Sequence, residues 1–315
     1  MELIRDFQNL RKSDTAIAGG KGASLGEMTQ AGIPVPDGFV ILASAFDRFL
    51  EETDIGVEIE ALLHKLNLKN INSIDRISNE IRDLILDAEF PKDIAKEVQK
   101  KISKLRAKYV AVRSSATAED SSVASWAGEL ESYLNTTEQN LLENIKRCWA
   151  SLFTPRAIFY RFEKKLNKIK ISVAVVIQKM IQSEISGICF TVHPITKDYD
   201  QMVIEAGYGL GEIIVGGKIT PDTYVVRKKN RIILDKNIGQ QKTMLLKNKG
   251  GNIEKRVPKS KQEKQKLSDM QILKLAKICQ KIEKHYKTPQ DIEWALNKGR
   301  FYILQARPIT TLTQL

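Results

Sequence analysis

The sequence is poor in cysteine and histidine, with three of each among 315 residues. Cys148, Cys189 and Cys279 are far apart and form no CxxC pair, which argues against a disulfide framework or a zinc site and fits a reducing cytoplasm. No run of about 18 apolar residues is present, so no transmembrane helix is expected. The first residues also lack the pattern of a signal peptide. We therefore expect a cytoplasmic protein with no membrane partner.

The basic residues lack interleaved aromatic residues. The net charge is +12, and lysine is spread along the chain, densest at 242–266. No RNA- or DNA-binding motif is present, so we expect a lysine-rich solvated surface and no nucleic acid; an acidic partner is the alternative. The hydrophobic content of 42% and the length allow a sizeable core and two or three sub-domains.

The most informative stretch, residues 289–309, is predicted to be a β-hairpin. Two apolar runs flank Asn297-Lys298-Gly299, interpreted as a three-residue turn in which the glycine supplies a positive φ. The pairs expected from that turn are Leu296 with Arg300, Glu293 with Ile303, and Asp291 with Gln305. One face would carry Asp291, Glu293, Ala295, Phe301, Ile303, Gln305 and Arg307. The other would carry Ile292, Trp294, Leu296, Tyr302, Leu304 and Ala306, and we expect both faces to be covered.

Three polar side chains of the first face, Glu293, Gln305 and Arg307, would be costly to bury without partners. Glu293 and Gln305 are expected to be diagonal neighbours, and their oxygens suit Mg²⁺, which commonly bridges to substrate phosphates. The fork of Arg307 suits a phosphate oxygen. The hairpin is therefore a candidate metal–triphosphate site. An internal Glu–Arg ion pair, with Gln305 as a bystander, remains an equal alternative.

A glycine-rich stretch begins at Gly19 and leads into a helix expected to start near Gly22. Exposed backbone N–H groups at a helix start favour an anion, and Lys21 would add a positive charge. The Walker A spacing is absent, and a plain turn at Gly19 and Gly20 is the alternative. Four amphipathic helices without a catalytic constellation are expected to follow, at Ser44–Leu50, Val57–Leu66, Ile74–Ala88 and Pro91–Leu105.

A short buried strand at 109–113 is expected to end in Arg113, a candidate phosphate ligand. The small and hydroxylated residues that follow predict a loop that closes over phosphates, with Gly128 allowing a close backbone approach. A surface loop with an exposed Arg113 is the alternative. The strand at 171–181 turns polar at Gln178, where its backbone edge could meet an adenine ring; an ordinary strand end is the alternative.

Cys148, within the helical stretch 138–166, is expected to be buried filler. The remaining elements expected before the hairpin are strands at 186–191 and 202–206, a meander at 223–255 and a helix at 262–287.

Together these stretches resemble the N-terminal ATP-binding region of phosphoenolpyruvate synthase and pyruvate phosphate dikinase, and equally that of rifampicin phosphotransferases. The resemblance rests on Gly20-Lys-Gly-Ala-Ser-Leu-Gly-Glu-Met, Ile33-Pro-Val-Pro-Asp-Gly-Phe, Val112-Arg-Ser-Ser-Ala-Thr-Ala-Glu-Asp, Val176-Ile-Gln-Lys-Met, Ser186-Gly-Ile-Cys-Phe-Thr, and Asp291-Ile-Glu-Trp-Ala with Ile303-Leu-Gln-Ala-Arg-Pro-Ile-Thr. It implies an α+β, ATP-grasp-like fold whose two lobes clasp ATP: an N-terminal lobe, 1–181, with a helical insert, and a C-terminal lobe, 182–315, with the metal-binding hairpin.

The resemblance also implies roles for individual residues. Lys21 and Arg113 would bind phosphates, and Gly128 and Ser132 would lie in the loop that covers them; Ser132 keeps the hydroxyl of the threonine frequent in relatives. The implied adenine contacts are Gln178 and the backbone through Met180. The implied Mg²⁺ ligands are Glu293 and Gln305. Arg307 would bind the transferring phosphates, so that the catalytic residues would be Arg307, Arg113 and Lys21.

Members of this family transfer the β-phosphoryl group of ATP to a histidine on a separate swivelling domain, releasing AMP. None of His64, His193 and His285 has the Thr-x-His context of that domain, so we expect all three to be structural or exposed. The sequence stops at Thr310–Leu315, where relatives begin the linker to the next domain, and it shows no acceptor-binding domain.

The expected function is therefore the ATP- and Mg²⁺-binding module of a dikinase-type phosphotransferase, similar to pyruvate, water dikinase. The histidine domain and the acceptor domain would act in trans or be missing. The alternatives are the ATP-binding domain of an antibiotic phosphotransferase and a non-catalytic nucleotide-binding module.

Overall fold

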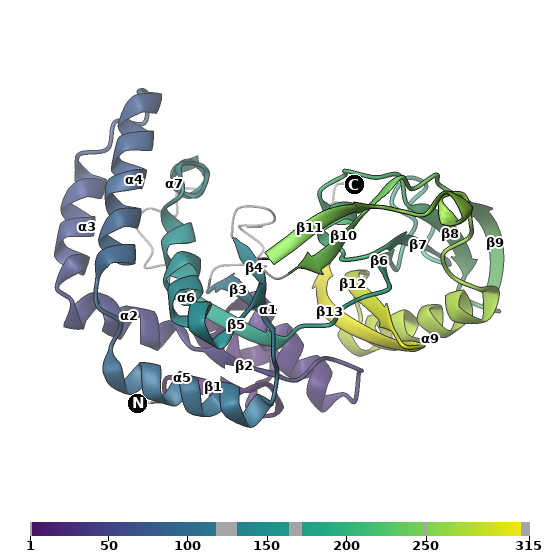
Figure 1. The fold of residues 1–315 in the computed structure, drawn as a ribbon, viewed down its shortest axis with the longest axis horizontal. Helices are drawn as coiled ribbons and strands as arrows, with labels where there is room; N and C mark the ends of the chain where they lie inside the picture. Colours follow the sequence, from purple (N-terminus) through teal and green to yellow (C-terminus); the bar gives the residue numbers. More distant parts are fainter. Residues whose placement is uncertain (1, 118–130, 164–171, 249–250, 310–315) are drawn as a thin grey trace. The chain divides into compact units, whose positions relative to one another are not determined.

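The structure is a computed structural model that describes residues 2–117, 131–163, 172–248 and 251–309 (Figure 1). It is mixed helix and sheet, as predicted. The chain divides into two compact units, the first formed by Met1–Glu27 and Asp37–Met180 and the second by Met28–Pro36 and Ile181–Leu315. In the described ranges no helix is long and apolar enough to cross a membrane.

The first unit contains an antiparallel five-stranded sheet in the order β1-β2-β5-β3-β4. Its strands are β1 (Ile4–Asp6), β2 (Gly38–Ile41), β3 (Val110–Ala116), β4 (Ser132–Thr136) and β5 (Val173–Lys179). The helices α1 (Thr15–Gln30), α2 (Ala43–Glu52), α3 (Ile55–His64), α4 (Ile71–Asp87), α5 (Lys92–Leu105), α6 (Leu141–Ala150) and α7 (Pro155–Glu163) accompany it; α1 continues past Glu27 into the second unit.

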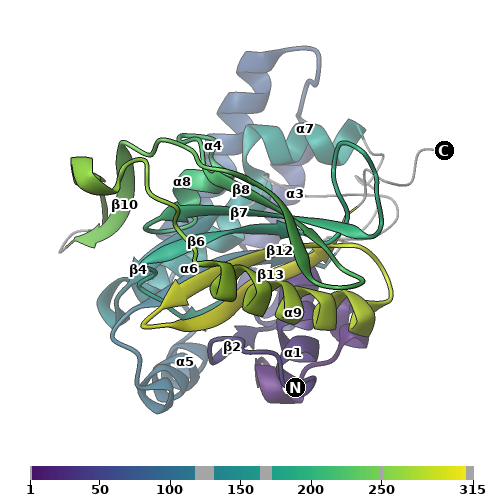
Figure 2. The same ribbon diagram turned by 90° about the vertical axis from the view of Figure 1, so that its right-hand side faces the viewer.

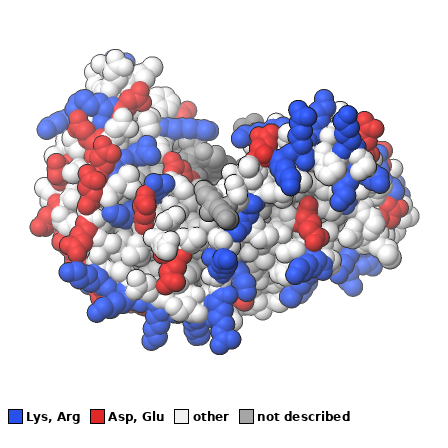
Figure 3. Space-filling model, viewed as in Figure 1, with Lys and Arg blue, Asp and Glu red and all other residues white. Residues whose placement is uncertain are grey.

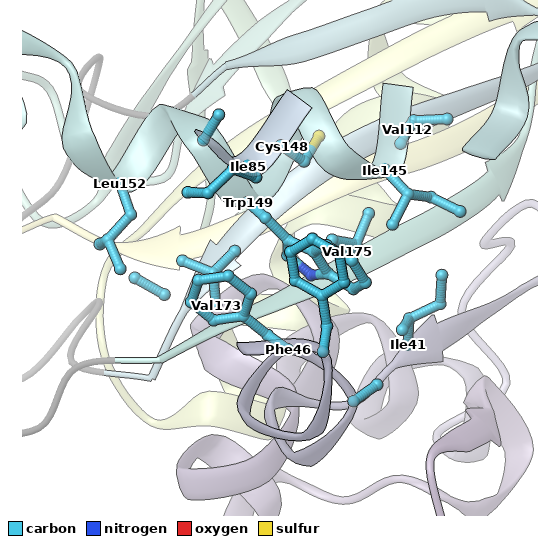
Figure 4. Close-up of a cluster of buried hydrophobic side chains, with 14 of the residues drawn as sticks. Ile41, Phe46, Ile85, Val112, Ile145, Cys148, Trp149, Leu152, Val173 and Val175 are labelled. Carbon is cyan, nitrogen blue, oxygen red and sulfur yellow. The ribbon is translucent and has the colours of Figure 1, made fainter. Parts of the chain in front are cut away.

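The core of this unit forms where α2, α4 and α6 pack together and α2 and α6 meet the sheet. Trp149 is fully buried against Phe46 and Phe49, with ring centroids 5.5 and 4.9 Å away (Figure 4). α4 contributes isoleucines at helical spacing, Ile74, Ile77, Ile81 and Ile85, which explains why its period was readable in the sequence. Cys148 is buried here, as predicted, and burial raises the pKa of its thiol well above the ordinary value.

The second unit contains an antiparallel six-stranded sheet in the order β13-β12-β6-β7-β8-β9, and a separate hairpin of β10 and β11. The strands are β6 (Ile185–Phe190), β7 (Gln201–Tyr208), β8 (Asp222–Arg227), β9 (Ile232–Asn237), β10 (Thr243–Asn248), β11 (Gly251–Arg256), β12 (Gln290–Asn297) and β13 (Arg300–Pro308). The helices are α8 (Glu212–Val215) and α9 (Asp269–Tyr286). Figure 2 shows α9 running along one side of the sheet, which buries Leu275, Cys279 and Ile282.

The second unit also includes the early segment Met28–Pro36. This segment is held by two hydrogen bonds: the Ile303 N–H donates to Pro34 O at 2.9 Å, and Lys281 Nζ donates to Ala31 O at 2.9 Å. The sheet-edge strand β13 is therefore covered there by residues from far away in the sequence.

Two predicted boundaries were wrong. The strand expected to end at Arg113 continues as β3 to Ala116, because the small residues Ser114 and Ser115 fit a fully buried ladder. The helix expected from residue 262 begins at Asp269, where Ser268 caps it: Gln271 N donates to Ser268 Oγ, and Ser268 N donates to Gln271 Oε1.

Figure 3 shows Lys and Arg side chains spread over the face in view and interspersed with Asp and Glu.

Candidate functional site

The hairpin of β12 and β13 exists, but its predicted register was wrong. The turn has two residues, Lys298 and Gly299, with φ of 49° and 72°, so that Asn297 pairs with Arg300. The pairs that replace the predicted ones are Leu296 with Phe301, Glu293 with Gln305, and Asp291 with Arg307. A bulge at Leu304, opposite the step from Glu293 to Trp294, shifts the pairing by one further residue, so that Glu293 pairs with Gln305.

The corrected register also changes the faces. Phe301 and Ile303, expected on the polar face, share the α9 side with Trp294; the Trp294 and Phe301 rings meet edge to face at 5.7 Å. Because Phe301 and Ile303 lie on the α9 side, the opposite face is more polar than predicted. There, Glu293 and Gln305 are direct partners, closer than the expected diagonal.

Arg307 on this polar face is paired with Asp291, a partner that the predicted register did not bring to it. Its Nε and Nη2 donate to Asp291 Oδ2 at 2.9 and 2.8 Å. The Asp291 side chain is 14% exposed and that of Arg307 is 36% exposed. The guanidinium is thus oriented by Asp291 and remains partly exposed, an arrangement suited to contact with an anion.

A third carboxylate lies on the same face. Glu293 is opposite Ile188 on β6, and Ile188 is opposite Glu205 on β7, so Glu205 lies two strands from Glu293, about 10 Å away. Burial raises the pKa of Glu205, and the nearby Asp291 charge raises it further. Burial likewise raises the pKa of Asp291; Arg307 opposes this shift and Glu293 adds to it. This face therefore carries an excess of desolvated negative charge that a cation would relieve.

Sequence reasoning did not select Glu205 or Asp291. The signal for Glu205 was one acidic residue inside an otherwise apolar strand. The signal for Asp291 was its spacing of two residues from Glu293, which puts both carboxylates on one face of a strand.

In the first unit, three predicted site residues share the sheet face opposite the helical core. Val112, Val175 and Ile177 point into the core, so the alternating residues Arg113 and Gln178 point the other way. Ser132 pairs with Arg113 and lies on the same side, exposed at the start of β4.

α1 packs against this same face through its glycines. A Cβ on Gly22 would lie 3.1 Å from Val40, whose neighbours in β2 point into the core. Gly19 breaks the helix with φ of 67°, and a Cβ there would lie 2.2 Å from Ser115 Oγ. Ser115 Oγ donates to Ala18 O at 3.0 Å and accepts from Gly22 N at 3.3 Å. Through these two bonds Ser115, which follows Arg113 by two residues in β3, holds the start of the predicted helix against the sheet. Lys21 is half-buried at this junction.

Gln178 is only 3% exposed, and its Nε2 has no hydrogen-bond partner among the described residues. Such a donor costs free energy unless something else accepts from it. The Met180 N–H donates to Tyr109 O at 3.0 Å and the Lys179 N–H to Asp37 O at 2.8 Å. Backbone contacts to an adenine from these two residues would therefore use their carbonyl groups.

The remaining candidates carry less information. Gly128 lies outside the described residues. His64 and His285 are exposed, as expected. His193 is half-buried, and its Nδ1 accepts the backbone N–H groups of Ile195 and Thr196 at 3.3 and 3.2 Å, a structural use.

Comparison with known proteins gives the class to which these features belong. Residues 15–315 match the pyruvate phosphate dikinase, AMP/ATP-binding domain family, and the chain belongs to this family. It is similar to probable phosphoenolpyruvate synthases of Methanocaldococcus jannaschii (46% identity over 99% of this chain and 27% of the relative) and Archaeoglobus fulgidus (47%, over 96% and 41%). It is also similar to a rifampicin phosphotransferase of Bacillus cereus (40%, over 98% and 36%). The chain therefore spans less than half of each of these relatives.

Proposed function

We propose that this chain is the Mg²⁺–ATP-binding module of a dikinase-type phosphotransferase of the phosphoenolpyruvate synthase kind, activating the β-phosphoryl group of ATP for transfer to a histidine on a separate domain. The observation that carries the proposal is the polar face of the β12–β13 hairpin. There, Glu293 and Gln305 are direct partners beside the Asp291–Arg307 pair.

The donor set of this face fits Mg²⁺. In the described part of the chain, no three His, Cys, Asp or Glu residues lie close enough to hold a metal by themselves. Mg²⁺ is commonly held by one or two protein oxygens together with substrate phosphates, which Glu293 and Gln305 match. When bound, Mg²⁺ would neutralise phosphate charge. Arg307, oriented by Asp291, would hold the transferring phosphate in line, since catalysis of this kind is largely positioning and charge stabilisation.

The first unit would supply the other nucleotide contacts in an ATP-grasp-like arrangement. Lys21 and Arg113 would bind phosphates, with Gly128 and Ser132 in the covering segment. Gln178 would give its unused donor to the adenine, beside the backbone of Met180. The lobes of that arrangement would be 1–181 and 182–315.

A second candidate is the ATP-binding part of an antibiotic phosphotransferase, which the similarity to the Bacillus cereus relative favours. Both candidates use the same nucleotide contacts and differ in the acceptor. The histidine and acceptor domains would be supplied outside the described chain, and a non-catalytic nucleotide-binding module is the fallback if no transfer occurs.

The test is to incubate the protein with Mg²⁺–ATP and to resolve AMP from ADP, with and without a histidine domain from one of the longer relatives. We expect tight ATP binding by calorimetry, and AMP formation that requires the histidine domain. Formation of ADP alone would contradict the dikinase proposal. Absence of ATP binding would contradict the nucleotide site itself.

A further inference from the structure

A groove on the second unit is lined almost entirely by cations. It lies between the turn that joins β8 to β9 and the side of α9, and has a volume of about 530 Å³. Six of its eight lining residues are Lys or Arg, and the other two are Ile278 and Gln280. No acidic residue lines it. The groove is built from the second unit alone and contains none of the proposed nucleotide contacts.

α9 contributes a stripe of like charges to this groove. Lys277, Lys281 and Lys284 are exposed at spacings of four and three residues, which places them on one face of the helix. Like charges at this spacing destabilise a helix. Lys281 Nζ reaches Ala31 O at 2.9 Å, but none of the three lysines forms an ion pair with a described residue. The repulsion along the stripe is therefore not compensated by nearby carboxylates.

The turn adds Lys229 and Arg231 opposite this stripe. Lys228, which also lines the groove, is held in place by its Nζ, which donates hydrogen bonds to Glu283 Oε1 and to Thr191 O, both at 2.8 Å. The Asp200 carboxylate accepts the Lys229 backbone N–H at 2.9 Å and so helps to fix the turn. These contacts hold the turn and Lys228 in place beneath the outer cations, and they already engage the carboxylates of Glu283 and Asp200.

We propose that this groove is a second anion site, which binds a short polyphosphate. The stripe from Lys277 to Lys284 is about 10 Å long, which suits two or three phosphates and is too short for the many phosphate contacts of a nucleic-acid tract. No aromatic side chain lines the groove to stack a base. The lysine ammonium is a compact point charge that donates hydrogen bonds to phosphate oxygens in several orientations, which favours a flexible, base-free chain. The volume falls in the range of small-ligand sites.

The test uses inorganic tripolyphosphate and three forms of the protein, measured by calorimetry at low salt. The first, called the parent, carries only Arg113→Ala, which weakens the proposed nucleotide site. The second adds Lys277→Ala, Lys281→Ala and Lys284→Ala. The third instead adds Lys96→Ala, Lys100→Ala and Lys104→Ala, which removes the same charge from an exposed stripe of α5, away from this groove.

We expect the α9 triple variant to bind tripolyphosphate about tenfold more weakly, and the α5 triple variant to bind it within about twofold of the parent. Equal weakening by both would mean general electrostatic attraction, and no weakening by either would place the anion elsewhere; both outcomes overturn the proposal. A single-stranded RNA oligonucleotide that binds the parent more tightly than tripolyphosphate, and loses that affinity in the α9 variant, would assign the groove to nucleic acid and also overturn it. Because the nucleotide site is weakened in every form, these outcomes do not depend on the proposed function.

Discussion

At the scale of single residues, Gln178 is a side chain that should lower the stability of the ligand-free fold and favour ligand binding. Its side chain is 3% exposed, and its Nε2 donates to no described residue. A buried donor without an acceptor costs about 1–3 kcal/mol. A side chain that lowers the stability of the ligand-free fold in this way is typical of a binding position.

We predict that Gln178→Leu, nearly equal in volume, will stabilise the ligand-free protein by about 1 kcal/mol and weaken ATP binding. Thermal unfolding and calorimetry measure the two effects. The matched control is Gln290→Leu: Gln290 is 1% exposed, and its Nε2 donates to Thr288 O and Thr288 Oγ1. That control should lose stability. A loss of stability in Gln178→Leu as well would contradict the assignment.

Arg307 is the residue on which transfer should depend most. We predict that Arg307→Ala will abolish AMP formation with the histidine domain present and will weaken ATP binding by about tenfold or less, because its role lies in charge stabilisation during transfer. Rapid-quench separation of AMP, with calorimetry alongside, tests both parts. Arg300→Ala is the control on the same hairpin, since Arg300 is exposed and stacks over the Tyr302 ring. Normal turnover in Arg307→Ala would contradict the role assigned to Arg307 in transfer.

At the scale of elements, the sequence predicted the helices well and the hairpin only in part. α2 to α5 begin and end within three residues of the predicted bounds, because their apolar period is strong. The β12–β13 register failed because two local features shift it in the same direction: the two-residue turn moves each pairing by one residue, and the bulge at Leu304 moves the pairings beyond it by one more. Neither is encoded by apolar alternation, although Lys298-Gly299 permits the turn.

The site was predictable where side-chain chemistry was unusual for its surroundings. Glu293, Gln305 and Arg307 stood out in an apolar ribbon, and the structure puts them on one face. The partner of Arg307 was missed because the predicted register placed Asp291 opposite Gln305. The role of Ser115 was missed because its bond to α1 joins residues 97 positions apart, a contact that no local pattern reports.

The junction of α1 and β3 gives a steric prediction. Gly19→Ala would place a Cβ 2.2 Å from Ser115 Oγ and 2.4 Å from Ser115 O, and would also strain φ. We predict a loss of about 3 kcal/mol or more by chemical denaturation, together with weaker ATP binding through displaced Lys21. Gly217→Ala separates the steric clash from the backbone strain. The φ of Gly217 is 64°, but nothing lies within 4 Å of the added Cβ, so only the strain of the positive φ, about 1 kcal/mol, should remain. Equal losses in the two variants would contradict the close-packed junction.

The polar sheet face gives a prediction about pH. The folded pKa of Glu205 lies above its ordinary value of 4.5. As pH rises past that value the unfolded chain ionises first, so the folded state loses stability until the folded pKa is passed, and the loss is complete at neutral pH. Glu205→Gln should therefore raise the Tm at pH 7 by up to about 2 °C, with the gain disappearing below about pH 4. A thermal scan across pH tests this; a lower Tm at pH 7 would contradict it.

At the scale of the whole molecule, the proposed nucleotide contacts are divided between two compact units. Lys21, Arg113 and Gln178 belong to the first, whereas Glu293 and Arg307 belong to the second. The chain spans less than half of the relatives named above. In the proposed function, each unit supplies contacts to the same nucleotide.

A double-mutant cycle tests whether both units contact the same nucleotide. If Lys21 and Arg307 bind one phosphate chain, removal of either should reduce the benefit of the other, because the nucleotide loses its fixed position. We predict that Lys21→Ala and Arg307→Ala together will change the ATP-binding free energy by an amount that differs from the sum of the single changes by at least about 0.5 kcal/mol. Calorimetry with Mg²⁺–ATP measures all four corners. The control cycle pairs Lys21→Ala with Arg300→Ala, which should be additive. Additivity in both cycles would mean that the units act on the nucleotide independently, and the shared site would have to be abandoned.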